Sequence, residues 1–149
     1  MAWATLADIQ ARLPGRTINE TSKPSSANVT GWIGEAEATL KGVLAAVGLP
    51  TNYTGDAALI LKVWVCDFAE GHTRQSYASA GGAADNADGK DMIERWEKRL
   101  DDICASPSKY GAILLAGSAG VPAGVTKVRG SAPTADPIFD MDSPGEEQL

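Results

Sequence analysis

The chain has 149 residues, of which 44% are hydrophobic and 21% are charged, and its formal net charge is −6. This length supports one domain of ordinary size, and the composition excludes wholesale disorder and fibrous repeats. No apolar stretch reaches the roughly 18 uncharged residues that a membrane span needs, and the first residues lack the basic start of a signal peptide. We therefore expect a soluble protein made in the cytoplasm, with no membrane partner.

The charge balance also bears on nucleic-acid binding. The chain has 19 Asp and Glu residues against 13 Lys and Arg residues, and the basic residues form no cluster. Phosphate backbones are bound by clustered Lys and Arg, so nucleic-acid binding is not expected as the main activity. An acidic surface is compatible with a passage through which DNA slides without being held.

The first predicted helix begins at Thr5 and ends before Pro14-Gly15. Thr5 and Asp8 have the spacing of a capping box, and the apolar residues that follow recur at helical steps: Leu6, Ile9 and Leu13. A helix of about two turns is unstable alone, so it must dock on the rest of the chain. Residues 16–27 are polar and predict a loop.

The second predicted helix runs from about residue 28 to residue 47, with Ser26 or Asn28 as its capping residue. Its apolar stripe has three- and four-residue steps and comprises Val29, Trp32, Ile33, Ala36, Leu40, Val43, Leu44 and Val47. Gly31, Gly34 and Gly42 each cost about 1 kcal/mol relative to alanine. They indicate either close approach of another helix or a helix that depends on packing.

The third predicted helix starts near Thr54 or Asp56 and ends near Ser79. Residues 57–66 are apolar almost all round, which is typical of a helix that is buried on most faces or lies between subunits. Trp32, Trp64 and Trp96 fall one on each long helix within the apolar stripes, so we expect them to pack in the core.

The composition of residues 80–85 predicts a flexible loop, followed by a fourth helix from about residue 90 to residue 105. Its apolar stripe holds Met92 or Ile93, Trp96, Leu100 and Ile103. After Pro107 the chain is rich in Gly and Pro, and its last sixteen residues carry acidic side chains with no Lys or Arg. We predict an all-α fold, a bundle of about four helices over residues 1–106, with an extended C-terminal arm over residues 107–149.

No motif for catalysis stands out. His72 is the sole histidine, and Asp67 and Glu70 lie near it in sequence, but no positioned nucleophile accompanies them. The chain has neither a Gly-x-Ser-x-Gly elbow nor a Gly-rich phosphate loop. We interpret His72 as structural and expect no enzyme activity and no cofactor.

Metal binding is not expected either. Cys66 and Cys104 are far apart and form no Cys-x-x-Cys pair, whereas a zinc site needs about four ligands. A disulfide between them requires that their helices meet, and a cytoplasmic chain would keep it reduced. Residues 85–90 are acidic but lack the closing Glu of a calcium loop.

The order of these elements resembles the head–tail connector, or adaptor, proteins of long-tailed bacteriophages. The resemblance covers roughly residues 3–106. It is carried by the opening Thr5-Leu6-Ala7-Asp8-Ile9, by the apolar helix at 59–69 and by the final helix at 92–103. Its most recognisable part is the second helix, with Val29, Trp32-Ile33, Ala36-Glu37 and Leu40.

The resemblance implies a structural protein of the virion neck, assembled in the host cytoplasm as a homo-oligomeric ring, usually of twelve copies. Its implied partners are the portal protein, tail or stopper proteins, and genomic DNA passing through the channel. The arm is expected to dock on the portal and to be dispensable for folding from residue 110 onward. The candidate portal or subunit contacts are Trp64, Tyr110, Ile113, Leu114, Leu115, Ile138 and Phe139.

Two alternatives remain open. Another neck or tail-completion protein would fit the same partners, although such proteins are commonly built on sheets. A small helical binding or regulatory module would fit the fold without any viral partner.

Overall fold

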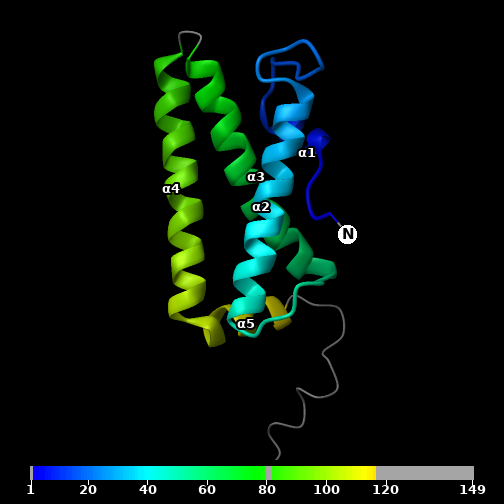
Figure 1. The fold of residues 1–149 in the computed structure, drawn as a ribbon, viewed down its shortest axis with the longest axis vertical. Helices are drawn as coiled ribbons and strands as arrows, with labels where there is room; N and C mark the ends of the chain where they lie inside the picture. Colours follow the sequence, from blue (N-terminus) through cyan, green and yellow to red (C-terminus); the bar gives the residue numbers. More distant parts are fainter. Residues whose placement is uncertain (1, 80–81, 117–149) are drawn as a thin grey trace, which may run out of the picture. The chain divides into compact units, whose positions relative to one another are not determined.

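The described part of the chain in the computed structural model, residues 2–79 and 82–116, is all α-helical and has no strand (Figure 1). Its helices are α1 (Leu6–Arg12), α2 (Ser26–Ala46), α3 (Gly55–Ala78), α4 (Ala83–Ala105) and α5 (Pro107–Ala116). The predicted all-α fold is confirmed for these residues. None of these helices is long and apolar enough to cross a membrane.

Helix α3 is the centre of the bundle and contacts all four other helices. Figure 1 shows α2, α3 and α4 side by side as long rods, with α5 crossing the end where α2 and α4 finish. The core between them is apolar, and Ile9, Leu40, Leu61, Ile103 and Leu114 are fully buried in it. Trp64 and Trp96 are buried as expected, whereas Trp32 is half-buried. Trp3, for which the sequence predicts no environment, is also buried.

The caps of the first three helices follow from local sequence. The N–H and hydroxyl groups of Thr5 donate to Asp8 Oδ2 at 2.9 and 2.7 Å, which fixes the start of α1 as predicted. Helix α2 starts two residues before its predicted position because Ser25 is the cap, and its N–H donates to Asn28 Oδ1 at 3.1 Å. Helix α3 starts after Thr54, as predicted.

Helix α4 begins at Ala83, seven residues before its predicted start. The sequence from Asp85 to Gly89 favours helix weakly, so local propensity alone predicts a loop. Two tertiary contacts stabilise this turn of helix. Asp85 pairs with Arg16 at 2.5 Å, and Gly89 packs directly against the backbone of Gly71 on α3.

Helix α5 corrects the expectation of an extended chain from residue 107. Residues 107–116 are helical, and Leu114 is fully buried in the bundle. The ring of Tyr110 meets Trp64 edge-on, with 5.9 Å between centroids, and Gly111 lies against Leu49. A deletion from residue 110 would therefore remove part of the core, contrary to the expectation that those residues are dispensable for folding.

The contact between α3 and α4 depends on two glycines. A Cβ atom on Gly71 would lie 2.9 Å from the carbonyl oxygen of Gly89, and one on Gly89 would lie 2.6 Å from the carbonyl oxygen of Gly71. We predict that Gly89→Ala lowers the free energy of unfolding by about 1–3 kcal/mol, because the helices must move apart. Urea denaturation followed by circular dichroism measures the change.

Gly34→Ala is the matched control, because a Cβ atom on Gly34 in α2 would meet nothing within 4 Å. This substitution should raise the free energy of unfolding by about 0.5–1 kcal/mol through helix propensity alone. Equal effects of the two substitutions would contradict the close approach of α3 and α4.

Candidate functional site

Two buried carboxylates on α3 hold the neighbouring helices in place. Asp67 and Glu70 are only 8% and 4% exposed. Arg12 of α1 donates from Nη1 to Asp67 Oδ1 at 2.9 Å and to Glu70 Oε2 at 3.2 Å. Arg99 of α4 reaches Asp67 Oδ2 at 3.2 Å. Because a buried charge is costly unless it is paired, these contacts fix α1 and α4 against α3.

The same network continues toward the turn between α3 and α4. Arg74 Nε donates to Glu70 Oε1 at 2.8 Å, and its Nη1 lies 3.4 Å from Asp85 Oδ1. Arg16 Nη2 binds the other oxygen of Asp85. Asp67 and Glu70 are thus engaged by arginines, not by His72.

His72 lies in an aromatic cluster. Its ring stacks on Trp32 with 5.5 Å between centroids and meets Phe68 edge-on at 4.5 Å, and Phe68 in turn contacts Trp96. Burial lowers the pKa of His72 below its ordinary value of 6.5, and the nearby charge of Glu35 partly opposes this. The contacts of His72 are therefore those of a packing residue.

The cysteines are both free. Cys66 is buried on α3, and burial raises the pKa of its thiol to about 11, so the thiol stays protonated at neutral pH. Cys104 is exposed on α4. Within residues 2–79 and 82–116, no group of three His, Cys, Asp or Glu side chains is placed to hold a metal ion.

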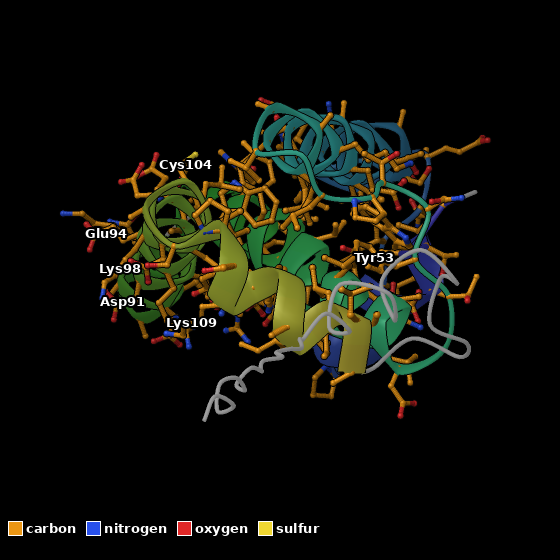
Figure 2. The ribbon with its side chains drawn as sticks, turned by 90° about the horizontal axis from the view of Figure 1, so that it is seen from below. Tyr53, Asp91, Glu94, Lys98, Cys104 and Lys109 are labelled. Atoms are coloured by element: carbon orange, nitrogen blue, oxygen red, sulfur yellow. The ribbon has the colours of Figure 1, made fainter. Side chains whose placement is uncertain are left out.

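A shallow groove of about 710 Å³ lies beside α4 and is bounded on the α3 side by Arg74. Its other lining residues are Met92 and five charged side chains, of which Asp91, Glu94 and Lys98 are seen on the outer side of α4 in Figure 2. Its lining holds three acidic and three basic side chains, so the groove selects neither an anion nor a cation.

The first half of α3 exposes large apolar side chains. Leu59 is 57% exposed and Val63 is 46% exposed, and their spacing of four residues places them on one face of the helix. Ala57, Leu61 and Val65 on the opposite face are fully buried. We call Leu59 and Val63 the apolar face of α3.

Helix α2 has an outer face made of small residues. Six exposed positions follow one another at steps of three or four residues: Ala27, Gly31, Gly34, Ala38, Gly42 and Ala45. A Cβ atom on any of the three glycines would meet nothing within 4 Å. The described residues of one chain thus supply no close contact that would require these glycines. We call these six residues the small-residue face of α2.

The residues predicted to contact the portal or another subunit differ in how exposed they are. Trp64 and Leu114 are buried inside the protein, and Tyr110 and Leu115 are half-buried. Ile113 is 40% exposed on α5. Ile138 and Phe139 lie outside the described residues.

The sequence prediction missed Leu59 and Val63, although their signal was present: the apolar run from residue 57 to residue 66 has more apolar positions than one buried face can use.

Comparison of the chain with protein-family models, with curated proteins and with solved structures gave no significant match.

The network around Asp67 yields a stability prediction. Asp67→Asn removes the charge that Arg12 and Arg99 share, and both guanidinium groups are mostly buried. We expect the free energy of unfolding to fall by about 2 kcal/mol, measured by urea denaturation. Glu94→Gln is the control, because its pair with Lys90 is 60–68% exposed and should contribute almost nothing. A similarly small loss for Asp67→Asn would contradict the role of this network.

His72 yields a pH prediction. Because burial lowers its pKa in the folded state, the unfolded state takes up a proton first as the pH falls. Stability should therefore be complete above pH 7 and should decrease as the pH falls through 6.5 toward the lower pKa of the folded protein. Urea denaturation of the wild type and His72→Phe at pH 7.5 and 6.0 tests this, since the variant should lack the decrease. An identical decrease in both proteins would assign it to other groups.

Proposed function

We propose that this protein is a head–tail connector of a long-tailed bacteriophage, which forms a ring beneath the portal and leaves a continuous passage for DNA. The proposal starts from the resemblance of residues 3–106 to that family. The most recognisable of the residues that carry the resemblance, including Trp32-Ile33 and Ala36-Glu37, lie on α2.

The observation that carries the proposal is a pair of unlike helix faces, both exposed in the part of the chain that the structure describes. Helix α2 packs on α3 through a buried stripe that includes Ile33 and Leu40 of α2. The small-residue face of α2 points away from this stripe. The apolar face of α3 likewise points away from Leu61 and Val65. Each face is therefore directed away from the buried side of its own helix, and Figure 2 shows α2 along one side of the bundle.

Two different exposed faces on one protein are suited to the repeated contacts of a closed ring. In a ring each copy presents one surface to the copy before it and another to the copy after it. Small residues allow another helix to approach closely, and Leu59 and Val63 supply side chains that can fill the space. Each well-buried apolar side chain contributes about 1.5–3 kcal/mol before ordering costs.

The apolar face alone is too small for a stable assembly. A specific interface buries about 800 Å² on each partner, more than two exposed side chains can provide. We therefore propose that the portal protein supplies further contacts. On this chain they would involve Ile113 and the residues after Ala116, where Ile138 and Phe139 are the apolar candidates. The net charge of −6 fits a channel wall that does not bind DNA.

One observation favours a second candidate, a small helical module that forms a two-fold dimer. The order of Gly and Ala along the small-residue face of α2 is nearly the same from either end of the helix. In an antiparallel dimer, Ala27 could therefore meet Ala45 of the second copy while Gly34 meets Ala38. A stable dimer without affinity for a portal would support this candidate.

We predict that Val63→Lys leaves the protein folded, since the side chain is already 46% exposed, but weakens ring formation and portal binding at least about tenfold. Analytical ultracentrifugation and negative-stain images of the protein mixed with the portal protein of the same virus measure this. The control is Ala87→Lys, which adds the same charge at an exposed site on α4. Assembly of both variants at wild-type level would remove the apolar face from the interface.

The small-residue face is tested by Gly34→Gln, with Thr39→Gln as a control at an exposed position of α2 outside that face. Glutamine favours helix more than glycine does, so the isolated protein should be at least as stable. Its longer side chain should block close approach of a second helix and reduce assembly, whereas Thr39→Gln should assemble normally. Normal assembly of Gly34→Gln would contradict a contact at this face.

The role of the C-terminal residues is tested by a chain that ends at Ala116. This truncation keeps Leu114 in the core, so we expect the truncated chain to fold and to give a helical circular dichroism spectrum. Binding to the portal should be lost, because Ile138 and Phe139 are absent. Co-sedimentation with the portal measures binding, and normal co-sedimentation of the truncated chain would show that these residues are not the anchors.

A further inference from the structure

We draw no further inference here: the strongest candidate outside the proposed interface, the open groove beside α4 that Asp91, Glu94 and Lys98 line, carries charges of both signs, and nothing in the described residues shows what covers it.

Discussion

The carboxylates of Asp67 and Glu70 are the constraint on which the arrangement of the bundle depends. Both are buried on the central helix, where an unpaired charge would be strongly unfavourable. Their partners come from three helices: Arg12 from α1, Arg74 from α3 itself and Arg99 from α4. Helices α1 and α4 are therefore restricted to positions from which their guanidinium groups reach α3, a restriction that apolar packing alone would not impose.

The position of α1 in turn decides which part of α3 stays uncovered. Leu59, Val63, Asp67 and Glu70 follow one another on a single face of α3, at steps of four, four and three residues. The charged half of that face binds Arg12 of α1, whereas the apolar half leaves Leu59 and Val63 exposed. One helix face is thus divided between charged contacts within the chain and exposed apolar side chains.

The sequence predicted elements best where the signal is local. Capping residues and apolar periodicity predicted the bounds of α1, α2 and α3 to within two residues. Hydrogen bonds between residues close in sequence, such as Thr5 and Asp8, fix where such helices start. The early start of α4 was not predictable, since it depends on the approach of Gly71 from another helix. Helix α5 was missed because its ten residues have no polar face to reveal a helical period and include Gly111.

The sequence by itself determined the helical class and the stripes that form the core, because period and capping are properties of adjacent residues. It also showed that the third helix has more apolar residues than one buried face can use. Only the tertiary structure decided which of them are exposed, leaving Leu59 and Val63 exposed while burying Trp64 and Val65. The physical reason is that exposure depends on where helices distant in sequence pack, and here buried charges and close glycine contacts set those positions.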